Sequence, residues 1–204
     1  SGTLYKGDFN YTASYTPGVA QAGQHVISNP YMAAIPIDAI NFGADNRMDE
    51  TVYVYNTGSL QQFNANESKT GVNPGQYIAS PFNVAGYGSI PNEIAPMQGF
   101  LVRTAQGVTQ SGSFSIAYNQ LVKNTAKQRA PKSPKSWLRL TLSAENTGDV
   151  MWLFSEPETS RDFDNGWDGR KMGGDAGTPM LFSHNETGNY QINAMNDIDN
   201  TDIA

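Results

Sequence analysis

The densest group of metal-ligating side chains in the sequence lies within residues 162–168 (DFDNGWD). It contains an Asn-Gly turn and three aspartates: Asp162, Asp164 and Asp168. Calcium prefers carboxylate and amide oxygens, but the EF-hand order fails here because Gly173 stands where that loop needs glutamate. The stretch therefore predicts either another type of calcium loop or an Asx turn whose carboxylates are solvated or paired with Arg161 and Arg170.

Other candidate chemistry is weaker. Residues 197–202 form a second acidic cluster, which we interpret as a polar tail rather than a second cation site. To act as a glycosidase pair, Glu156 and Glu158 would need to face each other across roughly 5 to 10 Å. Their closeness in the sequence is no evidence of that geometry. His25 and His184 stand in no two-histidine metal spacing and near no G-x-S-x-G turn. We therefore predict no enzyme.

Aromatic side chains are the remaining functional resource, because Tyr and Trp can stack on sugar rings or anchor a protein partner. Tyr87 and Trp167 stand among Gly and Asn residues and are predicted as exposed ligand-binding residues, with local packing over a loop as the alternative. Trp137 and Trp152 lie in apolar stretches, so we expect them to belong to covered strands.

The composition indicates a turn-rich globular chain. Of 204 residues, 20 are Gly, 11 are Pro and 16% are charged, against roughly 25% charged in an average domain. This balance argues against a disordered polyelectrolyte or a charged helical bundle. The absence of cysteine excludes disulfides, thiolate nucleophiles and cysteine-based zinc sites.

Strand patterns account for most of the chain. Alternation with period two marks Ser113 to Tyr118 and Trp137 to Leu142, while Thr51 to Tyr55 and Gly99 to Thr104 are apolar on both faces. Two hairpins are predicted, 137–142 with 150–154 and 179–183 with 190–195. Only 36–42 (PIDAINF) suggests a helix, of one or two turns. The fold class predicted is all-β, with two β-sandwich-like (jelly-roll or Ig-like) antiparallel units in tandem.

A basic segment separates the two predicted units. Residues 123–143 hold six Lys and Arg residues and no acidic residue, with Pro131 and Pro134 among them. Since proline discourages both helix and central strand, we place a linker at 131–135, between domains at 1–130 and 136–204. The loose cation spacing argues against nucleic acid, and the lack of a run of roughly 18 apolar residues argues against membrane insertion. Because the chain opens at Ser1 without Met, we expect a trimmed segment from which an export signal could have been lost.

The order of several short motifs resembles a module of secreted and cell-surface proteins of Bacteroidetes. These are SNPYMAAIPIDAI at 28–40, TVYVYNT at 51–57, NPGQYI at 73–78, PMQGFLVR at 96–103, WLRL at 137–140 and FDNGWDGRKM at 163–172, preceded by TLYKGDFNYTASY. The resemblance covers nearly the whole chain and departs at Ser28, Met32 and Ala33, where the family has Gly, Pro and Ser. It implies an adhesin-like, type IX-secreted β-sandwich module without catalytic chemistry, whose second domain is truncated at the carboxyl end.

The function predicted is a non-catalytic structural or adhesive module of a secreted or cell-surface bacterial protein. Its expected partners are other domains of a longer surface protein, and a glycan or a host or cell-surface protein. Two alternatives remain: a carbohydrate-binding module, calcium-dependent or not, of a polysaccharide-utilisation system, and a fragment of a secreted hydrolase. No cofactor other than calcium is indicated.

Overall fold

A computed structural model describes residues 3–56, 75–122, 136–143, 148–174, 176, 178–196 and 198. The described chain is almost entirely β-structure in several sheets, which confirms the predicted fold class. No helix among these residues has the length and apolar character needed to cross a bilayer.

The strands of the first half are β1 (Phe9–Ala13), β2 (Gln24–Ser28), β3 (Ile35–Pro36), β4 (Ile40–Asn41), β5 (Thr51–Asn56), β6 (Gln76–Pro81), β7 (Glu93–Ile94), β8 (Gly99–Arg103) and β9 (Gly112–Ile116). Those of the second half are β10 (Trp137–Ser143), β11 (Gly148–Ser155), β12 (Gly169–Arg170), β13 (Ser183–Asn185) and β14 (Gly188–Met195). Two short 3-10 turns complete the described elements, η1 (Ile37–Ala39) and η2 (Tyr118–Gln120). The helix predicted at 36–42 is thus a single 3-10 turn between β3 and β4.

Two compact units divide the chain, residues Ser1–Val54 with Ser80–Lys132, and Tyr55–Ala79 with Ser133–Ala204. The sequence-based division placed 55–79 in the first domain, whereas the structure groups the described residues of this stretch with the second unit. Gln76 donates from Nε2 to the carbonyl of Gly148 (2.5 Å), and the Ala79 N–H donates to Oε1 of Gln191 (2.8 Å). Residues so far apart in sequence leave no local signal of this pairing. The predicted linker at 131–135 lies outside the described residues.

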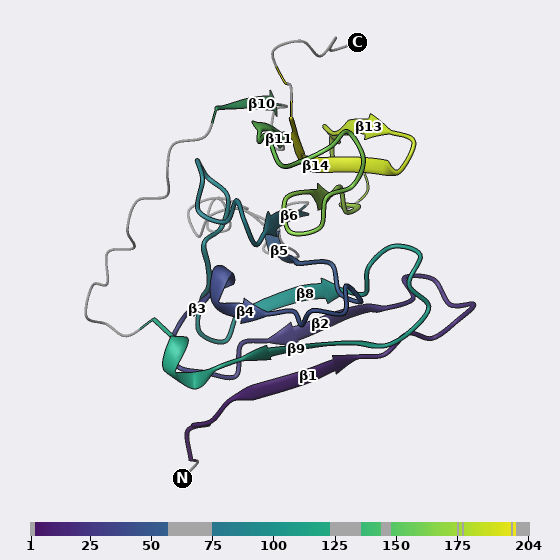
Figure 1. Ribbon diagram of the computed structural model, residues 1–204. Helices are drawn as coiled ribbons and strands as arrows, with labels where there is room; N and C mark the ends of the chain where they lie inside the picture. The colour runs from purple at the N-terminus through teal and green to yellow at the C-terminus, as the bar shows by residue number, and fades with distance from the viewer. Residues whose placement is uncertain are drawn as a thin grey trace. The chain divides into compact units, whose positions relative to one another are not determined.

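The first unit packs sheets face to face around an apolar core. One sheet has the order β1-β9-β4. In another, β2, β8 and β5 are neighbours in that order, and Val54 is the last residue of β5 that belongs to this unit. Figure 1 shows β2 and β8 running beside β1 and β9. Side chains of both sheets meet in one buried cluster, which includes Phe114 and Ile116 of β9 with Phe100 and Val102 of β8. Period-two alternation therefore places these side chains on the inner faces, as expected for a sandwich.

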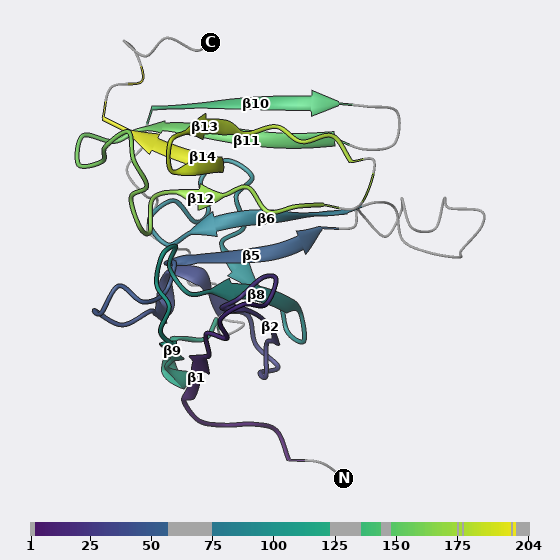
Figure 2. The same cartoon turned by 90° about the vertical axis from the view of Figure 1, so that its right-hand side faces the viewer.

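The second unit is built on a sheet of order β10-β11-β14-β12, with β13 paired to β14 (Figure 2). The predicted hairpin of 137–142 with 150–154 occurs as β10 and β11. The second hairpin joins β13 to β14, and only Ser183 of the predicted strand 179–183 belongs to β13. One pairing differs from the antiparallel expectation, because β11 and β14 run parallel. A parallel pair needs a long crossover connection, and the chain between these two strands, which carries β12 and β13, supplies it.

Candidate binding site

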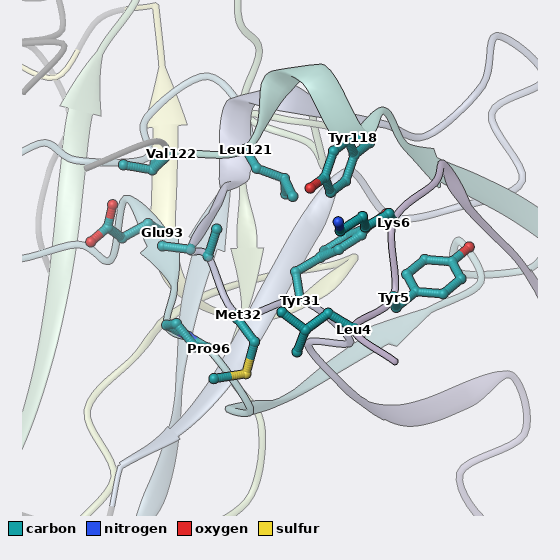
Figure 3. Close-up of a pocket in the computed structure, with 12 residues that line it drawn as sticks. Leu4, Tyr5, Lys6, Tyr31, Met32, Glu93, Pro96, Tyr118, Leu121 and Val122 are labelled. Atoms are coloured by element: carbon teal, nitrogen blue, oxygen red, sulfur yellow. The ribbon is translucent and has the colours of Figure 1, made fainter. Parts of the chain in front are cut away.

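A surface pocket in the first unit combines apolar and tyrosine side chains. It has a volume of about 420 Å³. Its lining comes from the segment before β1, the turn after β2, the β7 region and the turn η2, and comprises Leu4, Tyr5, Lys6, Tyr31, Met32, Ala33, Ala34, Glu93, Pro96, Tyr118, Leu121 and Val122. Figure 3 shows most of these side chains around the hollow, with Glu93 at one end and Tyr5 at the other.

Asn29 fixes the turn that carries the centre of this pocket. The side chain is buried, and its Oδ1 accepts the N–H of Tyr31 at 2.9 Å, which forms an Asx turn. Its Nδ2 donates to the carbonyls of Ala33, Ile94 and Ala95 at 3.0 to 3.1 Å. One amide side chain thus joins the turn after β2 to the end of β7 and to the residue that follows it.

Three tyrosine rings form the floor and wall of the pocket. The Tyr31 ring centroid lies 5.5 Å from that of Tyr5 and 5.8 Å from that of Tyr118. The buried Tyr31 hydroxyl donates to the carbonyl of Gly7 at 2.7 Å. Burial, with smaller contributions from Tyr5 and Asp8, raises the pKa of Tyr31 to about 12. Tyr31 therefore stays neutral near pH 7 and acts as a fixed hydrogen-bond donor.

The rim of the pocket is open and largely apolar. Leu4, Met32 and Tyr118 are exposed, and Lys6 and Glu93 supply one charge of each sign. Exposed aromatic and thioether side chains around a concave surface suit an apolar or aromatic side chain of a partner, because such groups gain most from leaving water. The pocket lining contains no Ser, His or Asp that could form a nucleophile and base pair.

The acidic loop of the second unit uses its carboxylates internally. Asp164 Oδ2 accepts the backbone N–H of Ser160 (2.7 Å) and its hydroxyl (3.0 Å). The buried Asp168 accepts the N–H groups of Asp164 and Ala194 at 2.8 and 2.7 Å. Burial raises the pKa of Asp168 to about 7, although these two N–H donors and Arg170 act in the opposite direction. These carboxylates accept from donors four or more residues away in the sequence, whereas an Asx turn uses the N–H two residues ahead.

Asp162, Asp164 and Asp168, the predicted calcium ligands, are not brought together. Asp162 is exposed and Asp168 is buried. Across the described part of the chain, no group of three or more His, Cys, Asp or Glu side chains is placed to hold a metal ion. Calcium binding at this loop therefore stays a prediction. The second acidic cluster at 197–202 lies almost wholly outside the described residues.

Two cationic side chains complete the packing beneath this loop. The Arg170 guanidinium carbon lies 4.0 Å from the Phe163 ring centroid and 5.5 Å from that of Tyr190. The Lys171 ammonium is fully buried and pairs with the carboxylate of Asp149. Burial lowers the pKa of Lys171, while the hydrogen bond and charge of Asp149 raise it. The motif FDNGWDGRKM thus contributes packing contacts within the second unit.

The predicted ligand-binding aromatics lie elsewhere. Tyr87 and Trp167 are both half-buried, and neither lines the pocket of Figure 3. Ligand binding by Tyr87 and Trp167 stays a prediction. Trp152 is buried as expected, but Trp137 is exposed, because the edge strand β10 leaves its side chain without full cover.

The remaining candidate groups serve structural contacts. His25 bonds to the Tyr11 hydroxyl and the Ser14 carbonyl, both at 2.9 Å, and His184 bonds to Asn189 Oδ1 at 2.7 Å. Glu156 is buried and Glu158 exposed, so this pair does not face across one cleft.

Sequence reasoning missed the pocket because its tyrosines come from three distant segments. In the sequence, Tyr31 stands only as part of the motif at 28–40, and no spacing connects Tyr5 with Tyr118.

The chain is similar to the minor fimbrium subunit Mfa5 of Porphyromonas gingivalis, at 31% identity over 216 aligned positions. The aligned region covers 98% of this chain and 17% of that subunit, so the chain spans less than a fifth of its relative. No family model matches the chain, and no solved structure matches it. The expected resemblance to Bacteroidetes surface proteins is confirmed in this general form. Type IX secretion stays a prediction, and carbohydrate binding gains no support.

Proposed function

We propose that this chain is a non-catalytic structural or adhesive module of a bacterial cell-surface polypeptide. The observation that carries the proposal is the similarity to a fimbrial subunit across 98% of the chain. Its partners in this proposal are other domains or subunits of a surface assembly. Its site of action is outside the cell.

The chemistry of the described side chains supports a structural role. The carboxylates of the acidic loop accept backbone hydrogen bonds, and both histidines are held in contacts within their own unit. A catalytic site instead needs a nucleophile, base or metal that converges on a substrate cavity. A screen of the full chain for hydrolase, esterase and glycosidase turnover is expected to find none. Turnover abolished by a single substitution would refute the proposal.

Adhesion requires a surface that a partner can enter, and the tyrosine pocket of the first unit offers one. We infer that it accepts an apolar or aromatic side chain from another part of the surface assembly. A single buried anchor of this kind can dominate the affinity of an interface. Met32 stands at the mouth of the pocket (Figure 3).

The test compares two exposed methionines. Met32 is 64% exposed and lines the pocket, whereas Met97 is 74% exposed and does not. In the encoding organism, Met32→Glu is expected to lower the amount of the parent polypeptide in the sheared surface fraction severalfold, and Met97→Glu is expected to leave it unchanged. Equal effects of the two variants, or none, would reject the pocket as the adhesive contact.

A further inference from the structure

The strand β10 forms an open edge of the second unit's sheet. Among the described residues it pairs only with β11, from Trp137 opposite Phe154 to Ser143 opposite Gly148. The Ser155 N–H donates to the Ser136 carbonyl at 2.9 Å. In an antiparallel ladder such bonds alternate along the strand, so the even-numbered residues of β10 bond to β11. The backbone N–H and C=O groups of the odd-numbered residues therefore point outward.

This edge lacks the usual protection against pairing with another chain. Natural edge strands carry proline, bulges or several charges, whereas β10 pairs with β11 in an unbroken register and has Arg139 as its only charge. Its apolar side chains are open to solvent: Trp137 is 42%, Leu138 39% and Leu142 40% exposed. A long apolar edge of this kind is a template for β-pairing.

We propose that the open edge of β10 pairs antiparallel with β10 of a second copy of this chain, centred on Leu140. The register opposes Trp137 to Ser143 of the other copy and Arg139 to Thr141, and these are the residues whose backbone groups point outward. Leu138 then faces Leu142 of the other copy, and Leu140 faces Leu140 of the other copy. All outward backbone groups of the strand are satisfied in this arrangement.

Side-chain chemistry favours this register over its neighbours. Cross-strand pairs are the unit of sheet stabilisation, and like charges directly opposite are destabilising. A register centred on Arg139 would oppose the two arginines, and one centred on Thr141 would leave Trp137 beyond the paired segment. The register centred on Leu140 avoids both penalties.

The paired leucines also extend an existing apolar cluster. Leu140 packs with Met151 and Leu153 of β11 on one face of the sheet. Leu138 and Leu142 lie on the same face, since side chains alternate along a strand. Pairing of two copies would continue this cluster across the symmetry axis and cover the two leucines that the single chain leaves exposed. This interface is independent of the proposed adhesive function, and its absence would leave that function standing.

Light scattering of the full chain gives the first test. We expect a concentration-dependent rise from 22.1 kDa toward twice that mass. Thr141→Pro removes an N–H that points outward, so it spares the bonds to β11 and is expected to give a monomer with an unchanged circular dichroism spectrum. The matched variant Thr141→Val keeps the N–H and is expected to dimerise. A wild-type monomer at the highest soluble concentration, or a dimer that survives Thr141→Pro, would overturn the proposal.

Single cysteines test the register, because the chain contains no cysteine of its own. Residues opposite each other at a non-hydrogen-bonded position have Cα atoms about 4.5 Å apart, within disulfide reach. Leu140→Cys is therefore expected to form a disulfide-linked dimer under mild oxidation. Leu142→Cys would place its two thiols several residues apart and is expected to remain largely unlinked. Equal crosslinking by both variants would contradict the register. If Thr141→Pro unfolds the chain, the two cysteine variants still test the pairing of β10 with β10.

Discussion

The two units of this chain stabilise their sheets by different means. In the first, two sheets enclose one large apolar cluster, and Asp49 is the buried charged residue among those described. In the second, the described buried charged residues are more numerous and gather around one sheet: Asp149, Glu156, Asp168 and Arg170, with the buried ammonium of Lys171.

Because of this difference, we expect substitutions to destabilise the two units for different reasons. A core of apolar side chains loses stability in proportion to the volume removed from it. A buried network of charges depends instead on every member keeping its partner, because an unpaired charge in a low-dielectric interior is costly. The first unit is therefore expected to respond to cavities, and the second to changes of charge.

The largest effect is expected from Phe114→Ala in the first unit. The Phe114 ring lies 5.7 to 6.5 Å, centroid to centroid, from the rings of Phe9, Tyr11, Phe42 and Phe100. Removing a buried phenyl ring costs about 4 kcal/mol of unfolding free energy. Hydrogen exchange by mass spectrometry is expected to show lost protection in peptides from the first unit. The exposed Phe182→Ala serves as control and should change protection little.

Lys171→Met is the corresponding test in the second unit. It leaves the Asp149 carboxylate buried without its cation, which is expected to cost about 3 kcal/mol in denaturant unfolding. The double variant Asp149→Asn with Lys171→Met has no unpaired charge and should be more stable than the single variant. A double variant as unstable as the sum of both single changes would show that the ion pair has no energetic coupling.

Asn29→Asp tests how the first unit holds its pocket. Asp keeps the acceptor for the Tyr31 N–H but loses the donors to three carbonyls, so we expect a loss of about 2 kcal/mol. The Tyr31 ring should also lose its fixed position, which near-ultraviolet circular dichroism would detect. Asn41→Asp offers a control, because Asn41 Oδ1 accepts the Gly43 N–H and its replacement keeps that bond.

The smallest effect is a dependence on pH from Asp168. Burial raises the pKa of this carboxyl from 3.8 to about 7. Between these values the unfolded chain has released the proton and the folded chain still binds it, so stability falls as pH rises. We expect a decrease of about 1 kcal/mol between pH 5.5 and pH 6.5, measured by thermal unfolding. The slope should be lost in Asp168→Asn, and stability that increases over this range would show that the carboxyl stays ionised.

Local patterns in the sequence predicted the elements whose partners are close by. The β10–β11 hairpin follows from alternation and turn-forming residues close together in the sequence. The exposure of Trp137 could not be predicted this way. It depends on β10 lying at a sheet edge, which sequence periodicity does not report.

Contacts between distant segments explain what the sequence did not reveal. The parallel pairing of β11 with β14 and the buried pair of Asp149 with Lys171 join residues separated by tens of positions. Lysine is rarely buried, so its side chain at position 171 would be assigned to the surface from composition alone. The tyrosine pocket is likewise assembled from four segments that the fold brings together.

The most direct test of the account is labelling of intact cells of the encoding organism with antibodies against this chain. The account predicts that unpermeabilised cells label as strongly as permeabilised ones, since the module acts on the outer surface. Labelling that appears only after permeabilisation would place the chain inside the cell and contradict the proposed function.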